Sequence, residues 1–356
     1  MNMVVTERMK HFNIPGVSVT HFADGEISWS KHFGTLEKGT GKTVDDNSIF
    51  HACSMSKMIT AICVLRLTQS GKLDLHKDVN EYLTSWKIPD NEFTKTKKVT
   101  LANLLAHQAG LVDIAGSFNP YKDGDSVPSL VDILKGATSY SPKEVNIKYE
   151  PETTCQYSDA GYCIINQVLI DVLGESIPQA AEWIIFKPLK LSRTFFWEMG
   201  RNAYDGISID DCAVGHNKHG HVVKEVRATY PNIEGAALWT TTRELASIII
   251  DLLKSYHGKD GLVLNQEMAR RMLTPYGCDE HAGLGVFLFL NKDNETESYF
   301  MSQGWGVGMQ CKLRTYIEGQ SGVIVMTNSD PGLDQSESLV GEIIKYVCNA
   351  NGTMSN

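Results

Sequence analysis

The sequence predicts an α/β fold of the α+β kind, in which an antiparallel sheet flanked by terminal helices lies beside a mainly helical domain. Three observations predict it. Strand-like runs lie near both ends of the 356 residues, two middle runs are apolar on almost every side, and turn or capping residues bound most runs. We therefore expect a discontinuous sheet domain from residues 1–50 and 283–356, and a mainly helical domain with insertions from residues 51–282.

The strand-like runs at the two chain ends are short and separated by turn residues. Near the start, GVSVTHF and EISWSKHF flank Ala23-Asp24-Gly25, which predicts a β-hairpin. After Gly283 the strand pattern returns in GLGVFLFL, ESYFMS, MQCKLRTY and GVIVMTN. The last run, SESLVGEIIKYVCN, has the amphipathic pattern of a helix that covers a sheet.

The middle of the chain is predicted to be helical. Residues 57–70, KMITAICVLRLTQS, are apolar nearly all round and precede Gly71, as expected of a buried helix with a glycine C-cap. Residues 159–173, DAGYCIINQVLIDVL, have the same character and precede Gly174. Two further helices are expected, at 101–107 and from the capping-box sequence TTRE at 241–244 onward.

Composition and charge exclude several functional classes. The formal net charge is −9 and no run of Lys and Arg forms a basic face, so we expect no nucleic-acid partner. No apolar run reaches the ~18–20 residues of a membrane-spanning helix, and the N-terminus lacks the apolar region of a signal peptide. We therefore expect a cytoplasmic protein without a membrane partner. The eight cysteines form no CxxC pair and are expected to be small buried side chains in a reducing compartment.

The three histidines of GHNKHGH, residues 215–221, are the pattern that most suggests a metal. The Asn, Lys and Gly between them are turn residues, so we interpret the segment as a solvated hairpin and expect no metal site. No P-loop or dinucleotide-binding fingerprint occurs, and we expect no cofactor.

The sequence Ser54-Met55-Ser56-Lys57 lies where the strand-like SIFHAC meets the first buried helix. A serine at a helix N-terminus lies near free N–H groups that favour developing negative charge. Lys57 is three residues on, so it shares a helical face with Ser54 and can act as a base if apolar surroundings remove its proton. The alternative is that Ser54 only caps the helix and Lys57 is a solvated side chain.

A second group of polar residues, Tyr157-Ser158-Asp159, directly precedes another buried helix. If the chain brings Tyr157 close to Ser54 and Lys57, its hydroxyl can relay a proton to a leaving group. The alternative for this segment is a helix cap preceded by a core tyrosine.

These residues, together with several motifs in a fixed order, resemble the serine β-lactamase and penicillin-binding-protein superfamily, in its class C-like branch of esterases and peptidases. The resemblance runs over nearly the whole chain and implies a β-lactamase/DD-peptidase-like fold with its active site in the cleft between two domains. Beyond Ser54 and Lys57, it is carried by IPGVSV, SGKLDL, LLAHQAGL, YSDAGY, GAALWTTTREL, MQCKLRTY and GVIVMTN.

The resemblance implies a serine acyl-transfer mechanism, with Ser54 as nucleophile and with Lys57 and Tyr157 moving its proton. The tetrahedral oxyanion would accept hydrogen bonds from the Ser54 N–H and from an N–H of an inner strand. In LLAHQAGL, the resemblance implies a packing role for His107.

The third motif departs from the pattern of the superfamily, which places Lys-Thr-Gly or His-x-Gly on the inner strand. Here the matching positions are Ser302-Gln303-Gly304, without a basic residue, and Trp305 then supplies the strand N–H. A second register, the Trp-x-Gly of some esterase relatives, would begin at Trp305 but lacks its final glycine. In the second motif Asp159 stands where many relatives have Asn, and an ionised Asp accepts hydrogen bonds but donates none.

The predicted function is therefore hydrolysis of a small ester or amide through an acyl-enzyme on Ser54. Two alternatives use the same scaffold: an acyltransferase with the same acyl-serine, and a non-catalytic penicillin-binding-like module that only binds a ligand. The sequence gives a small-molecule ester or amide as the partner and leaves the oligomeric state unknown.

Overall fold

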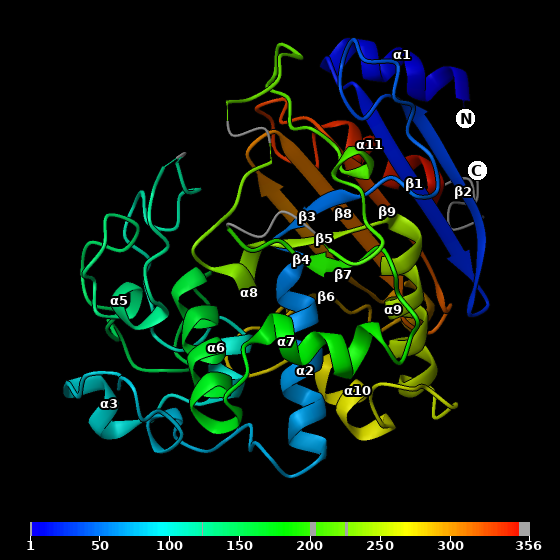
Figure 1. Ribbon diagram of the computed structural model, residues 1–356. Helices are drawn as coiled ribbons and strands as arrows, with labels where there is room; N and C mark the ends of the chain where they lie inside the picture. Colours follow the sequence, from blue (N-terminus) through cyan, green and yellow to red (C-terminus); the bar gives the residue numbers. More distant parts are fainter. Residues whose placement is uncertain (1, 123, 200–203, 225–226, 349–356) are drawn as a thin grey trace.

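Strands from both ends of the chain form one six-stranded antiparallel sheet in the computed structural model, which describes residues 2–122, 124–199, 204–224 and 227–348. The strand order is β2-β1-β9-β8-β7-β6. The N-terminal hairpin therefore joins the C-terminal strands where β1 pairs with β9 (Figure 1). The strands are β1 (Gly16–Ala23), β2 (Glu26–Gly34), β6 (Phe287–Phe289), β7 (Tyr299–Gly306), β8 (Met309–Tyr316) and β9 (Ser321–Thr327).

Terminal helices cover one face of this sheet, and the rest of the protein covers the other. Side chains along β9 point alternately to the two faces of the sheet, and both faces are buried. Val323 and Val325 pack against α1 (Asn2–Phe12) and α11 (Leu339–Cys348). Ile324 and Met326 point into the main core. Figure 1 shows α1 and α11 together at the side of the sheet away from α2.

The helical part is built around α2 (Ser56–Gln69), whose residues are buried over most of its length. The second long helix of this part, α6 (Asp159–Leu173), ends at Gly174 in the left-handed conformation (φ +71°). It packs on α4 (Leu101–Leu105) and α8 (Ile233–Ala236), which also contact α2. The other helices are α3 (Glu92–Thr96), α5 (Leu130–Leu134), α7 (Ile177–Ala181), α9 (Thr242–Tyr256) and α10 (Gln266–Met272).

A small second sheet, which the sequence analysis did not foresee, lies between the large sheet and α2. Its order is β3-β5-β4, with β3 (Phe50–Cys53), β4 (Phe195–Phe196) and β5 (Leu238–Thr240). Because β3 leads directly into α2, this sheet fixes the start of the helix against the large sheet.

The predicted mixed α/β class with antiparallel sheets is confirmed, and three local predictions change. The helix expected at 101–107 ends at Leu105, because His107 has a left-handed backbone (φ +57°). GLGVFLFL is a strand only at Phe287–Phe289, since Gly285 also turns the chain with a positive φ. His216 is fully buried and not solvated, and its Nδ1 lies 2.9 Å from the Asn328 carbonyl oxygen. Within the described residues, no helix has the length and apolarity needed to cross a bilayer.

Candidate active site

Ser54 lies in the turn between β3 and α2 and does not serve as a helix cap. The N-cap residue is Met55, which makes no side-chain capping bond; the Lys57 N–H instead donates to the Ser54 carbonyl oxygen (3.1 Å) and the Met58 N–H to the Met55 carbonyl oxygen (3.2 Å). Ser56 fixes this turn instead, because its hydroxyl donates to the Cys53 carbonyl (2.5 Å) and accepts the Leu238 N–H (2.9 Å). The Ser54 hydroxyl therefore remains available for chemistry at a partly exposed position.

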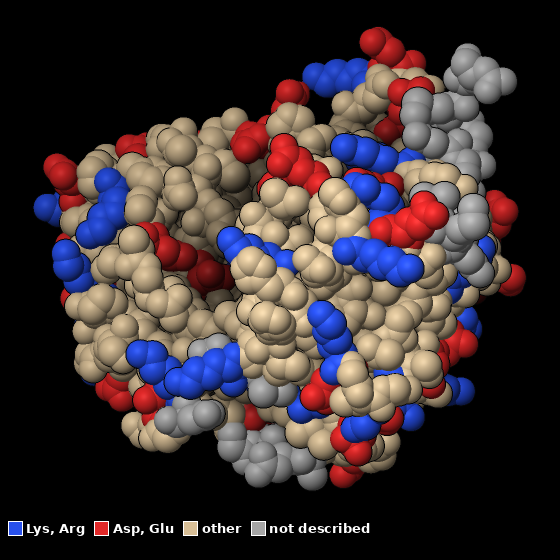
Figure 2. Space-filling view, turned by 90° about the horizontal axis from the view of Figure 1, so that it is seen from above, with Lys and Arg blue, Asp and Glu red and all other residues tan. Residues whose placement is uncertain are grey.

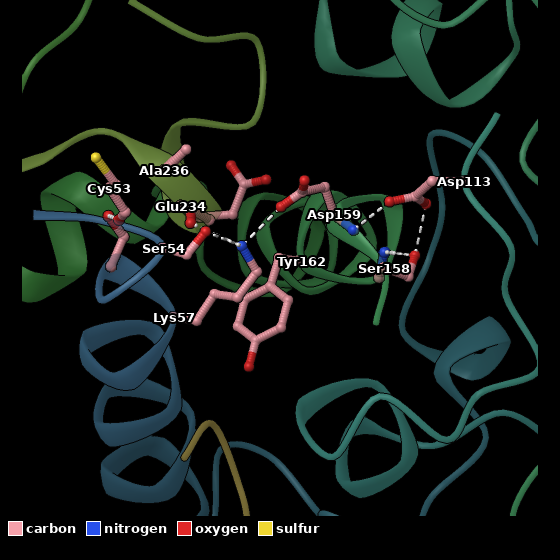
Figure 3. Close-up of polar contacts among 12 residues, drawn as sticks. Cys53, Ser54, Lys57, Asp113, Ser158, Asp159, Tyr162, Glu234 and Ala236 are labelled. Carbon is pink, nitrogen blue, oxygen red and sulfur yellow. Dashed lines mark hydrogen bonds and ion pairs between the residues drawn. The ribbon is translucent and has the colours of Figure 1, made fainter. Parts of the chain in front are cut away.

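The Lys57 ammonium is buried and faces three acceptors, one for each of its N–H bonds. Its Nζ lies 2.6 Å from Asp159 Oδ1, 2.8 Å from the Gly235 carbonyl oxygen and 3.5 Å from Ser54 Oγ. Figure 3 shows this nitrogen between Ser54 on one side and Asp159 on the other.

The charge state of Lys57 follows from this arrangement. Burial opposes the charge, but the Asp159 carboxylate and the neighbouring Tyr157 outweigh burial and raise the pKa of Lys57 above its usual range. The sequence analysis expected apolar surroundings to remove the proton of Lys57. The ion pair with Asp159 instead keeps this lysine protonated in the resting protein.

Tyr157 lies at the edge of the site, 39% exposed, with the Lys57 Nζ 4.9 Å from its ring centroid. Burial of its hydroxyl raises the pKa of Tyr157, while interactions of that hydroxyl with Lys57 and Ser54 lower it in part. The His107 ring packs against Tyr157 with 4.3 Å between centroids, and His107 Nδ1 accepts the Ser158 N–H at 3.2 Å. His107 thus positions the segment that carries Tyr157, a packing contact of the kind expected for it.

The start of α6 is held by Asp113, a residue that the sequence analysis did not single out. Its carboxylate accepts hydrogen bonds from the Ser158 hydroxyl (2.7 Å) and from the N–H groups of Asp159 (2.5 Å) and Ala160 (3.3 Å). These bonds orient Asp159 toward Lys57 (Figure 3). The only sequence clue to Asp113 was a lone acidic residue two positions after the LLAHQAGL segment.

Strand β7 brings the third motif alongside Ser54. Ser302 and Gln303 line a small cavity together with Ser54, Lys57 and Tyr157. Gly304 lies against β3: a Cβ there would be 2.8 Å from the Cys53 Cβ, so only glycine allows the two strands to approach this closely. Among the described residues, β6 pairs with β7 only as far as Met301, so that edge of β7 has no strand partner along the motif.

A buried carboxyl group also lies close enough to Lys57 to interact with its charge. Glu234 is 1% exposed and accepts a hydrogen bond from the Asn166 amide (3.0 Å), and burial raises its pKa to about 7. Trp305, at the end of the motif, is 46% exposed.

Viewed from above, the molecule has a hollow between its two parts with acidic side chains in its depth (Figure 2). No group of His, Cys, Asp and Glu side chains within the described ranges is arranged to hold a metal ion.

A family model described as Beta-lactamase matches residues 1–343. The chain belongs to the Beta-lactamase family. This membership supports serine hydrolase activity.

Among curated relatives of this Beta-lactamase family chain, penicillin-binding protein 4 of Amycolatopsis lactamdurans is 30% identical over 52% of this chain and 46% of that protein. The chain spans about half the length of curated relatives such as this one. Two solved structures share the fold at 19% identity: the octameric penicillin-binding protein homologue from Pyrococcus abyssi (TM-score 0.76, 99% of this chain and 76% of that one) and the D-amino acid amidase from Ochrobactrum anthropi SV3 (TM-score 0.72, 97% and 98%).

Proposed function

We propose that this chain is a serine hydrolase that cleaves a small ester or amide through an acyl-enzyme on Ser54. The observation that carries the proposal is the position of the Lys57 ammonium, which is held by Asp159 and the Gly235 carbonyl within 3.5 Å of the Ser54 hydroxyl. A serine that caps no helix, beside a buried and oriented lysine, has the arrangement of an activated nucleophile.

In this proposal Asp159 is the final acceptor of the Ser54 proton. Lys57 is already protonated, so it accepts a proton from Ser54 only as it passes one of its own to Asp159, 2.6 Å away. The serine oxygen then attacks the substrate carbonyl, and the proton returns through Lys57 and Tyr157 to the leaving group. Relatives with Asn at this position have no carboxylate there to take the proton. The proposed relay therefore depends on Asp159 of this chain.

The proposed oxyanion site consists of the Ser54 and Trp305 N–H groups. Support comes from the close approach of Gly304 to Cys53, which favours the register Ser302-Gln303-Gly304 over the one beginning at Trp305. The open edge of β7 leaves room for a substrate carbonyl beside these donors.

The proposed substrate is neutral next to its reacting carbonyl. Among the described residues that line the cavity at Ser54, Lys57 is the only Lys or Arg, and its three donors already face Asp159, Gly235 and Ser54. A substrate carboxylate would lose its water there without gaining a positively charged partner.

The test is labelling with a fluorophosphonate probe, followed by peptide mass spectrometry and assays with chromogenic esters, D-amino-acid amides and nitrocefin. We expect the probe to modify Ser54 and at least one neutral ester or amide to be hydrolysed. An unmodified Ser54 would instead favour a binding module without catalysis. Product that shifts to an added nucleophile rather than to water would favour the acyltransferase.

A further inference from the structure

A buried cysteine and histidine lie directly behind Ser54, and the proposed hydrolysis uses neither. Cys53 and His51 are each 2% exposed on β3, and the Cys53 Sγ lies 3.4 Å from the His51 Nδ1. Cys53 also has a left-handed backbone (φ +47°), which is unfavourable for a residue with a side chain and is held here by the surrounding strands.

The surroundings of His51 fix which of its nitrogens carries the proton. Its Nε2 is hydrogen-bonded to the Ala236 carbonyl oxygen, which can only accept, so Nε2 is protonated. In the neutral ring Nδ1 is therefore an acceptor that faces the Cys53 thiol. The ring is stacked on Trp239 with 5.1 Å between centroids, which holds this orientation. Burial opposes ionisation of Cys53, but hydrogen bonding with Cys311 and the nearby His51 lower its pKa to about 5.

A second thiol lies beside this pair. Cys311, on β8, contacts the Ala52 carbonyl oxygen with its Sγ at 3.1 Å. The Gly304 backbone brings the two cysteines together, because a Cβ on that glycine would be 2.6 Å from the Cys311 Sγ and 2.8 Å from the Cys53 Cβ. Burial raises the pKa of Cys311, and its hydrogen bond with Cys53 raises it further.

We propose that Cys53 and Cys311 form an oxidation site for hydroperoxides, and that their disulfide reversibly inhibits hydrolysis at Ser54. The Cys53 thiolate attacks one peroxide oxygen and becomes a sulfenic acid, while the other oxygen leaves and takes up a proton. The Cys311 sulfur then attacks the Cys53 sulfur, and the sulfenic oxygen leaves as water. Overall, two thiols lose two electrons to one hydroperoxide, which is reduced to water and an alcohol, or to two waters when it is hydrogen peroxide.

The position of the pair explains how a disulfide would act on the site. Cys53 directly precedes Ser54, and its Sγ lies under Gly306, where a Cβ would be only 2.8 Å away. Gly306 is partly exposed and carries no side chain of its own over the sulfur, and the Tyr230 hydroxyl lies on the same side of this glycine. Drawing Cys53 toward β8 would shift the Ser54 N–H and hydroxyl, and a misplacement of about 1 Å in a reacting group lowers rates by about 100-fold. The inhibition rests on the proposed function, whereas the oxidation does not.

The experiment uses the full chain in a Cys278→Ser background, which removes a thiol that is exposed. After treatment with hydrogen peroxide, non-reducing peptide mapping should find a crosslink between the peptides of Cys53 and Cys311. Hydrolysis should fall by about 100-fold and recover with dithiothreitol. In Cys311→Ala no crosslink can form, and dimedone should trap the sulfenic acid on Cys53. Cys53→Ala should keep its activity through the same treatment.

Absence of this crosslink after peroxide, in protein that retains its thermal unfolding transition, would overturn the oxidation site. Equal loss of activity in Cys53→Ala would overturn the inhibition. Peptide mapping detects the crosslink whether or not the protein hydrolyses a substrate. A crosslink in a chain that hydrolyses nothing would therefore refute the proposed function and leave the oxidation site supported.

Discussion

The Lys57 ammonium lies 2.6 Å from a carboxylate oxygen of Asp159, and their side chains are only 4% and 27% exposed. The superfamily motif that this segment resembles has a neutral asparagine at the position of Asp159. Removing two charges from water offsets much of their attraction, so such a pair is weak support for stability. Its consequence for chemistry is larger, because the pair holds Lys57 in its charged form and places a proton acceptor behind it.

Replacing Asp159 with Asn tests the proposed relay. Asn can accept a hydrogen bond from Lys57 but cannot take its proton, so kcat/KM near neutral pH should fall by about 10²–10⁴-fold. Without the carboxylate, which opposes the effect of burial, the pKa of Lys57 falls. The remaining activity should therefore rise with pH as neutral Lys57 becomes populated. The measurement is kcat/KM as a function of pH, and a variant with wild-type rate and profile would exclude Asp159 as the acceptor.

Ser54→Ala should abolish hydrolysis while leaving the fold intact. Loss of a nucleophile lowers turnover by roughly 10⁴–10⁶-fold, and the Ser54 hydroxyl caps no helix, so the thermal unfolding midpoint should change little. The neighbouring Ser56→Ala is the contrasting variant, because it removes the hydrogen bonds that link Cys53, Ser56 and Leu238 and should lower stability. Unchanged turnover in Ser54→Ala would rule out the acyl-serine mechanism.

Lys57 and Tyr157 should act as one proton-transfer unit with Ser54. Residues that work as a unit show non-additive losses, so Lys57→Ala combined with Tyr157→Phe should be little worse than the more damaging single change. The measurement is a double-mutant cycle on kcat/KM with one neutral ester. Losses that multiply in full would instead indicate independent roles.

The parts of the fold that the sequence predicted are those governed by local chemistry. The hairpin at Asp24 and Gly25 forms because both residues adopt the positive φ that the turn requires (+55° and +76°). The helix from Asp159 to Leu173 begins after Ser158, whose hydroxyl accepts the Gly161 N–H, and ends at Gly174. Such signals lie within a few residues of each other and need no tertiary information.

The predictions that failed or were missing depend on contacts distant in sequence. The strands Phe195–Phe196 and Leu238–Thr240 are too short to show a pattern, and they exist because each pairs with a segment more than 40 residues away. Thr241 caps α9 as predicted, but Glu244 binds the backbone of Ser192 and Arg193. The charge of Lys57 was missed for the same reason, since Asp159 is 102 residues away.

Glu234→Gln should reveal a buried carboxyl through the pH dependence of stability. Burial raises the pKa of Glu234 from 4.5 to about 7, so the protonated form favours folding. Its contribution is full below 4.5 and is lost as pH rises through about 7, whereas Gln contributes equally throughout. The stability of the wild type relative to the variant should therefore drop by about 3 kcal/mol across this window, as measured by urea unfolding. A constant difference would mean that Glu234 titrates normally.

The last prediction concerns the charge of the substrate. A free carboxylate close to Asp159 would meet a repulsion of about 4 kcal/mol at ~4 Å and an effective dielectric of about 20. The structure reduces this estimate, because Lys57 neutralises Asp159. What remains is the loss of hydration without a free Lys or Arg among the described residues of the cavity, since Ser302 and Gln303 occupy the position of the basic motif and neither is charged. A residual penalty of about 1.4 kcal/mol already lowers kcat/KM about tenfold.

Matched substrates that differ only as free acid and methyl ester measure this penalty, together with nitrocefin as a carboxylate-bearing β-lactam. We expect the ester to be preferred by about tenfold or more and nitrocefin to be a poor substrate. Ser302→Lys adds a cation on the face of β7 that lines the cavity and should raise the acid-to-ester ratio, because a cation beside the carboxylate offsets its desolvation. Ser302→Ala removes the hydroxyl without adding charge and should leave the ratio low. Acids that react as fast as esters in the wild type, or efficient nitrocefin turnover, would show that another group of this chain binds the carboxylate.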